Sequence, residues 1–196
     1  MVTHLFNAMQ SFHHRDPGLV GLLTSEKLAG NKVWCGIIAD GVHAHPAAIR
    51  IAYKTSFDQL ALVTDAIIAM GFKDGRYKFG QQSIDVRGDK AYVAETQVCS
   101  SISMKNVSLY FYLFQTLTGS VATMQSSITK FIKFSRCSVV EALEAASLHP
   151  ATIMNIADRK GSLNCGADAD FVILRPGDLS VVSTWIDGEC VYKAEN

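Results

Sequence analysis

Residues 33–46 read VWCGIIADGVHAHP, and this stretch decides the fold class. Its first seven residues form a near-continuous apolar run, which is typical of a strand buried on both faces. Polar residues follow at once, and Pro46 opens the segment PAAIRIAYKTS, which predicts a helix over 46–56. The next apolar run, 60–63 (LALV), predicts another short strand. Strand, loop and helix in alternation predict an α/β protein with a parallel sheet.

The chain changes character after residue 71. Residues 71–95 alternate apolar and polar side chains between turn signals at Asp74-Gly75 and Gly88-Asp89, which predicts antiparallel hairpins. The C-terminal segments DADFVILRP and VVSTWIDGECVY predict further strands, with a hairpin turn at Asp187-Gly188.

Between these β segments, residues 124–157 predict a long helical region with breaks around 136–138 and at His149-Pro150. Part of its sequence has apolar residues near helical spacing, so we expect a stripe that faces the core. The stripe consists of Val140, Leu143, Ala146 and Ile153.

The composition of the 196 residues limits the function classes. Lys and Arg number 18, as do Asp and Glu, and this balance argues against a nucleic-acid-binding or polybasic membrane surface. No apolar run is long enough to span a membrane. The five cysteines show no CxxC spacing and no signal peptide precedes them, so we expect reduced core thiols in a cytoplasmic protein.

Polar side chains follow three strands of the predicted sheet. His4 follows the first strand, Asp40 and His43 follow the strand in 33–39, and Asp65 follows LALVT. Any one of them could simply cap a loop or helix. Because ligands bind beyond the carboxyl ends of parallel strands, we expect the three strand ends together to form a site suited to metal-assisted hydrolysis. The neighbouring cluster His13-His14-Arg15 could hold an anion or could be an ordinary solvated loop.

Five motifs occur in order: THLFNAM with HHRDPG, GIIADGVHAHP, LVTDA, EALEAASLHPA and GSLNCGADADFVIL. Together they closely resemble the N-acetylglucosamine-6-phosphate deacetylases, a family of the metal-dependent amidohydrolase superfamily. The resemblance implies the C-terminal part of a (β/α)₈ TIM barrel over residues 1–157 and strands of a small β-sandwich over 158–196. It also implies hydrolysis of N-acetylglucosamine 6-phosphate to glucosamine 6-phosphate and acetate, with a sugar phosphate as the small-molecule partner.

The resemblance assigns roles to individual positions. It implies that His4 binds a divalent metal ion, with zinc favoured and iron, cobalt or manganese as alternatives. Asp65 matches the catalytic acid/base that activates water and protonates the amine. The remaining matched positions are substrate-binding; they are Asn7, Ala8, Arg15, Asp40, His43, Leu117, Thr118 and Gly119. Arg15 and His43 match residues that hold the phosphate, in some members from the neighbouring subunit, so we expect a homodimer for the full-length protein.

Two features depart from the family pattern. A catalytic metal site needs about three protein ligands, and the matched motifs supply only His4, so we expect a truncated, aggregation-prone fragment that is inactive alone. In addition, residues 98–115 (VCSSISMKNVSLYFYLFQ) interrupt an otherwise direct passage from AYVAETQ to TLTGS. Their 18 codons could begin with GT and end with CAG, so we expect a retained intron translated in frame rather than a lid loop or an inserted strand.

Two other functions are alternatives to the deacetylase. The chain could be a non-catalytic fragment or pseudoenzyme that binds a sugar phosphate or pairs with a full-length partner. It could also be an amidohydrolase with a different amide substrate, although the anion-binding groups around Arg15 and His43 argue against a neutral one.

Overall fold

The computed structural model describes residues 1–24, 33–94 and 119–195. Two compact units make up the chain, Met1–Thr64 with Met124–Asn196 and Asp65–Thr123. The predicted insert 98–115, Cys99, Leu117 and Thr118 lie outside the described residues.

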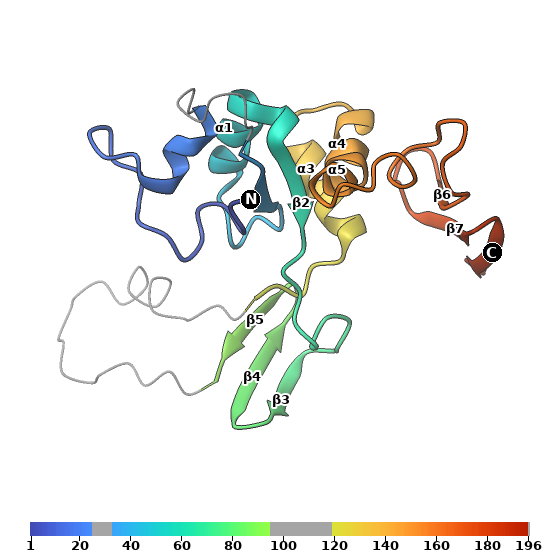
Figure 1. Ribbon diagram of the computed structural model, residues 1–196. Coiled ribbons are helices and arrows are strands. Elements are labelled where there is room, and N and C mark those ends of the chain that lie inside the picture. Colours follow the sequence, from blue (N-terminus) through green and yellow to red (C-terminus); the bar gives the residue numbers. More distant parts are fainter. Residues whose placement is uncertain (25–32, 95–118, 196) are drawn as a thin grey trace. The chain divides into compact units, whose positions relative to one another are not determined.

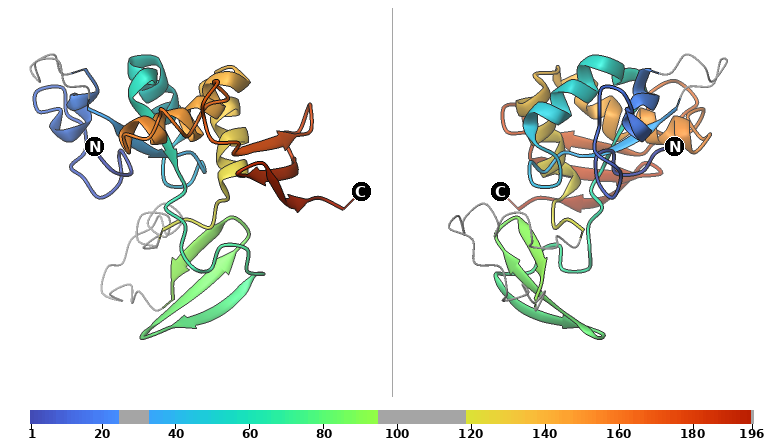
Figure 2. Two further views of the ribbon diagram at one scale, coloured as in Figure 1. Left: turned by 45° about the vertical axis from the view of Figure 1, so that its right-hand side comes forward. Right: turned by 90° about the vertical axis from the view of Figure 1, so that its left-hand side faces the viewer.

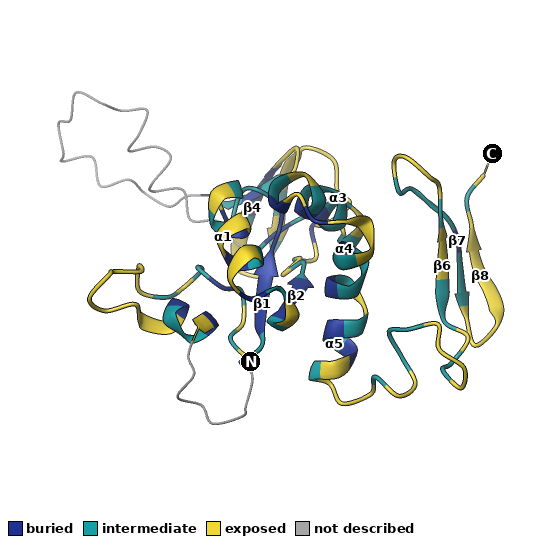
Figure 3. Ribbon diagram, turned by 90° about the horizontal axis from the view of Figure 1, so that it is seen from above, coloured by how far each residue is buried: buried dark blue, intermediate teal, exposed yellow. Residues whose placement is uncertain are grey.

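The first unit contains the predicted strand, helix and strand. Strand β1 (Cys35–Ile38) and strand β2 (Leu60–Val63) pair in parallel, from Cys35 opposite Leu60 to Ile38 opposite Val63, and helix α1 (Pro46–Ser56) connects them (Figure 1). All four residues of β1 are buried, as expected for an apolar strand covered on both faces (Figure 3). The α/β content predicted from the sequence is therefore confirmed.

Local sequence explains where α1 begins. His45 is its N-cap, and the His45 Nδ1 atom accepts a hydrogen bond from the amide of Ala47 at 3.1 Å. Pro46 occupies the first helical position, where its missing N–H removes no helical bond. Short 3-10 helices, η1 (Gly18–Thr24) and η3 (Phe57–Gln59), precede and follow this helix.

The predicted helical region consists of α3 (Met124–Ser135), α4 (Val139–Ala146) and α5 (Leu148–Ile153). The first break lies where predicted, because Arg136 has a φ of 62° and Ser138 with Glu141 forms a capping box that starts α4. The second break lies at Ser147, so Pro150 belongs to the first turn of α5, where proline is tolerated. No helix in the described ranges is long and apolar enough to cross a membrane.

The predicted apolar stripe on the helical region is wrong for Val140, which is 64% exposed. The fully buried residues of α4 are Ala142 and Ala145, which pack into the main core around Phe131. Helix α4 lies against β2, and small alanine side chains allow this close approach. The other predicted stripe positions, Leu143, Ala146 and Ile153, are half-buried.

The C-terminal residues form an antiparallel sheet of β6 (Phe171–Leu174), β7 (Val181–Ile186) and β8 (Glu189–Lys193). The hairpin turn predicted at Asp187-Gly188 is confirmed. The expectation of core thiols holds for Cys35 and Cys137, but it is wrong for Cys165 and Cys190, which are exposed. These two cysteines lie in a turn and on β8, where no core covers them.

The second unit contains the antiparallel sheet β3 (Gly75–Phe79), β4 (Gln82–Arg87) and β5 (Lys90–Val93) (Figure 2). The hairpin at Gly88-Asp89 is confirmed. The other turn is at Gly80-Gln81, because Gly75 already pairs with Val86. One face of this sheet packs in a small core around Ile84, Val86 and Ala91.

Candidate active site

The turn that carries His4 begins beside β1. Val2 forms a parallel bridge with Cys35, and the amide of Leu5 donates a hydrogen bond to the carbonyl of Gly36 at 2.7 Å. Leu5 is fully buried in the core. Strands β1 and β2 pair in parallel as predicted, but the predicted strand before His4 is only a single bridge at Val2, and residues 3–9 form bends and turns. His4 lies two residues after this bridge.

This turn has an unusual backbone. His4, Phe6 and Ala8 have φ values of 32°, 75° and 51°, a region that side chains other than glycine rarely adopt. The amide of Asn7 donates to the carbonyl of His4 at 2.9 Å, and the Asn7 side chain donates to the carbonyl of Leu5 at 3.3 Å. Strained backbone of this kind is concentrated at functional sites because the surrounding structure must hold it.

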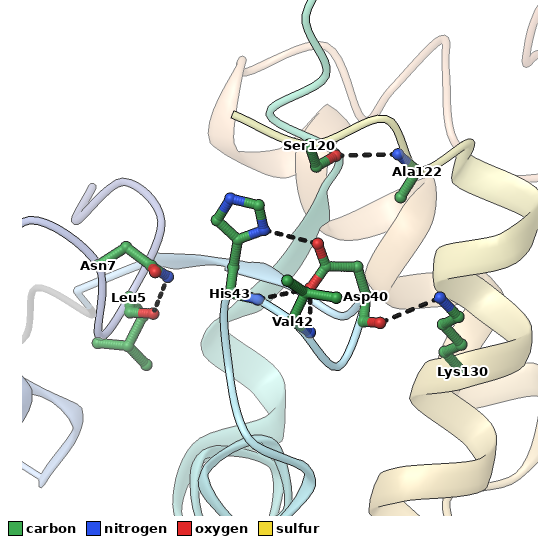
Figure 4. A network of polar contacts seen from close by, with 8 residues as sticks. All are labelled: Leu5, Asn7, Asp40, Val42, His43, Ser120, Ala122 and Lys130. Atoms are coloured by element: carbon green, nitrogen blue, oxygen red, sulfur yellow. Dashed lines mark hydrogen bonds and ion pairs between the residues drawn. The ribbon is translucent and has the colours of Figure 1, made fainter. Parts of the chain in front are cut away.

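Asp40 and His43 meet in the loop that follows β1. One carboxylate oxygen of Asp40 accepts the backbone amides of Val42 and His43 at 2.8 and 2.9 Å. The other oxygen lies 2.6 Å from Nδ1 of His43, as Figure 4 shows. Asp40 is 3% exposed. The sequence placed both residues in one loop, and the structure joins their side chains.

Helix α3 fixes this loop from a distant part of the chain. The ammonium group of Lys130 donates to the backbone carbonyl of Asp40 at 3.0 Å (Figure 4). The ring of Phe134 lies so near Gly41 that a Cβ atom there would be 2.9 Å from it. Neither contact has a local sequence signal, since 90 positions separate Lys130 from Asp40.

Asp40 is held in its charged form. Burial raises the cost of ionising this carboxyl group, but hydrogen bonds from the ring and amide of His43 and from the amide of Val42 outweigh it and lower the pKa of Asp40. An ionised carboxylate only accepts hydrogen bonds, so the 2.6 Å contact requires a proton on Nδ1 of His43. The Nε2 atom of His43 is buried and has no partner among the described residues.

Asp65 follows β2 by two residues and begins the second unit. It has a φ of 48°, and its carbonyl accepts the amide of Ser120 at 2.8 Å. Ser120 is nearly fully buried, and its hydroxyl oxygen accepts the amide of Ala122 at 3.1 Å. The backbone of this segment therefore lies directly against that of the predicted acid/base residue.

Gly119 makes this approach possible. It has a φ of 55°, and a Cβ atom on it would lie 2.8 Å from the carbonyl oxygen of Asp65 and 2.7 Å from a methyl of Ile67. Only glycine fits both requirements. The structure thus brings together two predicted site residues, Asp65 and Gly119, that lie far apart in the sequence.

Arg15 lies in an exposed loop. The amides of His13 and Asp16 donate to each other's carbonyls at 3.2 and 3.0 Å, and the amide of Arg15 donates to Nδ1 of His13 at 3.2 Å. The rings of His13 and His14 lie 4.3 Å apart. This geometry exposes the guanidinium of Arg15 beside two imidazole rings and fits both interpretations of the cluster, the anion-binding loop and the ordinary surface loop.

A divalent metal ion fits these residues only in part. The buried Nδ1 of His4 has no protein partner among the described residues, which suits a metal ligand. However, the ranges that the structure describes contain no group of three His, Cys, Asp or Glu residues that could hold a metal ion. Since a catalytic site takes about three protein ligands, His4 represents an incomplete ligand set.

Comparisons with known proteins identify the family. A model of the amidohydrolase family matches residues 2–191. An N-acetylglucosamine-6-phosphate deacetylase of Danio rerio is 50% identical over 193 residues, which are 98% of this chain and 43% of the relative. The crystal structure of an N-acetylglucosamine-6-phosphate deacetylase from Thermotoga maritima has a TM-score of 0.78 at 28% identity and covers 98% of this chain and 46% of that one.

A Mycobacterium smegmatis deacetylase, solved as a mutant in complex with N-acetyl-D-glucosamine-6-phosphate, has a TM-score of 0.75 at 33% identity, over 96% of this chain and 44% of that one. The chain thus spans less than half the length of the relatives it matches. Because the family model matches almost every residue, the chain belongs to the amidohydrolase family.

Proposed function

We propose that this chain forms part of an N-acetylglucosamine-6-phosphate deacetylase, which hydrolyses the acetamido group of N-acetylglucosamine 6-phosphate to an amine and acetate. The observation that supports this most directly is the 50% identity over 98% of the chain to a deacetylase with that name. The deacetylase solved with N-acetyl-D-glucosamine-6-phosphate supports the same substrate.

In this proposal Asp65 takes a proton from the attacking water and delivers it to the amine nitrogen as the amide bond breaks. Its carbonyl is held by Ser120, which limits how far its backbone can shift. His4 would be one ligand of the metal ion, zinc or another divalent cation, which would supply Lewis-acid activation when bound.

The substrate is held by other groups. Asn7 and Ala8 contact it from the turn after His4, and residues 117–119 line the sugar. Arg15 and His43 bind the phosphate, because a guanidinium and an imidazole ring suit a dianion. We further propose a homodimer, a cytoplasmic location, and a fold in which residues 1–157 belong to a TIM barrel and 158–196 to a β-sandwich.

The ligand count favours one alternative. Because His4 is not part of any three-ligand group in the described residues, the chain by itself could bind a sugar phosphate without hydrolysing it. The deacetylase proposal requires the other metal ligands to come from residues that the structure does not describe or from another polypeptide segment.

An exchange experiment separates these two functions. The chain would replace the aligned segment of the Danio rerio relative, and acetate release from N-acetylglucosamine 6-phosphate would be measured with Zn²⁺ present. We expect turnover, and a loss of roughly 10²- to 10⁴-fold in the Asp65→Asn variant. Asp178→Asn, which changes an exposed turn, serves as the control. A chimera that is folded and binds the sugar phosphate without releasing acetate would support the non-catalytic alternative.

A further inference from the structure

The side chain of Asp40 is fully engaged within its own loop. One oxygen accepts two backbone amides and the other faces Nδ1 of His43, and the residue is 3% exposed. A ligand that approached this carboxylate would have to displace these bonds. The contacts therefore favour an indirect role over direct contact with a substrate.

The consequence of these bonds appears at His43. With Asp40 ionised, Nδ1 of His43 must carry a proton, because a carboxylate offers no hydrogen to donate. The ring is then fixed with Nε2 on the opposite side, pointing away from Asp40 in Figure 4. This atom is buried and has no hydrogen-bond partner among the described residues. The pair thus presents one ring nitrogen of defined orientation.

We propose that Asp40 is a positioning residue, which fixes His43 in the form protonated on Nδ1 and presents Nε2 to an anionic ligand. A phosphate monoester that arrives as its monoanion can transfer its proton to Nε2, which then donates a hydrogen bond to the resulting dianion, and the nearby carboxylate of Asp40 balances the charge of the imidazolium. The identity of the ligand rests on the proposed function. The assignment of a proton to Nδ1 rests on the contacts of Asp40 and does not depend on the proposed function.

Asp40→Asn tests the proposal because the two side chains have nearly the same shape. The amide oxygen of the introduced side chain must replace the oxygen that accepts the two backbone amides, since an NH₂ group there would face two donors. Its NH₂ group then faces Nδ1 of His43, which must become an acceptor. The substitution should therefore keep the loop and move the proton to Nε2.

The protonation form can be measured by long-range ¹H–¹⁵N correlation NMR of the 196-residue chain labelled with ¹⁵N-histidine. The ring signals of His43 are assigned by their loss in the His43→Gln variant. We expect a proton on Nδ1 in the wild-type chain and on Nε2 alone in Asp40→Asn at the same pH. Asp178→Asn removes a carboxylate that caps a distant turn and should leave His43 unchanged. An unprotonated Nδ1 in the wild-type chain would overturn the proposal even if the variant did not fold, and so would an unaltered ring form in a folded Asp40→Asn chain.

Titration with glucosamine 6-phosphate provides the second readout. If the sugar phosphate binds, we expect its affinity to fall roughly tenfold in Asp40→Asn, because the donor to the phosphate is then a neutral imidazole instead of an imidazolium whose charge a carboxylate balances. An unchanged affinity would contradict the positioning role. If the wild-type chain shows Nδ1–H but binds no sugar phosphate, the assignment of the ligand fails and the effect of Asp40 on the ring stands.

Discussion

Replacing Gly119 with alanine should open the contact that holds Asp65. The added Cβ would lie 2.8 Å from the Asp65 carbonyl oxygen and 2.7 Å from a methyl of Ile67. The backbone atom cannot rotate away, so the segment must shift. A left-handed φ costs an alanine about 1–2 kcal/mol, and overpacking adds about 1–3 kcal/mol. We therefore expect the local opening free energy to fall by about 2–5 kcal/mol.

Native-state hydrogen exchange measures this opening directly. The reporters are the amides of Ser120 and Ile67, which bond to the carbonyls of Asp65 and Ser120 at 2.8 and 2.9 Å. A change of about 1.4 kcal/mol alters the opening equilibrium constant tenfold. The lower bound of about 2 kcal/mol therefore means that both amides should exchange at least about thirtyfold faster in Gly119→Ala.

A second glycine provides a matched control. Gly80 lies in the β3–β4 turn with a φ of 61°, and a Cβ atom there would meet nothing within 4 Å. Gly80→Ala therefore has a similar conformational cost without the clash, and it should leave the two reporter amides almost unchanged. Equal exchange at these amides in both variants would refute the reasoning, because the contact with Asp65 would then contribute nothing.

Three further predictions concern other parts of the chain. The hydroxyl of Tyr53 donates a hydrogen bond to the carboxylate of Glu141 at 2.8 Å. This bond, burial and the charge of Glu141 raise the pKa of Tyr53 to about 12. The contribution of this bond to folding stability is therefore complete below about pH 10 and is lost as the pH rises through about 12. In Glu141→Gln, ultraviolet absorbance titration should show this phenol ionising closer to about pH 10. Phe131→Ala should lower the free energy of unfolding in urea by about 3–5 kcal/mol, because Phe131 is fully buried in the main core, and a loss below about 1 kcal/mol would contradict its central place. Deleting residues 98–115 removes an apolar segment rich in β-formers and should reduce aggregation measured by light scattering; equal scattering would argue against this source of aggregation.

The elements that the sequence predicted well are those with strong local signals. Strand β2 has the predicted bounds, because LALV is an apolar run that ends at polar residues. Helix α1 begins at Pro46 as predicted, since the first helical position suits proline. The first helical break lies where it was predicted, and the capping box between Ser138 and Glu141, three positions apart, starts α4 there.

The errors arise where distant packing decides the outcome. Helical spacing alone placed Val140 on the inner face, but the approach of α4 to β2 selects Ala142 and Ala145 instead. The same limit applies to the candidate site. The sequence placed Asp40 beside His43, but the bond from Lys130 to the Asp40 carbonyl joins positions 90 residues apart and has no local signal.

The strained residues of the candidate site are held by bonds that also build the fold. His4 and Asp65 both have positive φ values, which are unfavourable unless neighbouring structure fixes them. The amide of Leu5, the residue after His4, donates a hydrogen bond to a carbonyl of β1, and the amide of Ser120 donates to the carbonyl of Asp65. Because each bond joins segments distant in sequence, the residue types can be recognised locally, but the backbone geometry at both positions depends on the folded chain. If either hydrogen bond were lost, the backbone would relax from its strained φ and the side chain of His4 or Asp65 would lose its fixed orientation. The stability of these backbone contacts and the fixed orientation of the two side chains should therefore decrease together.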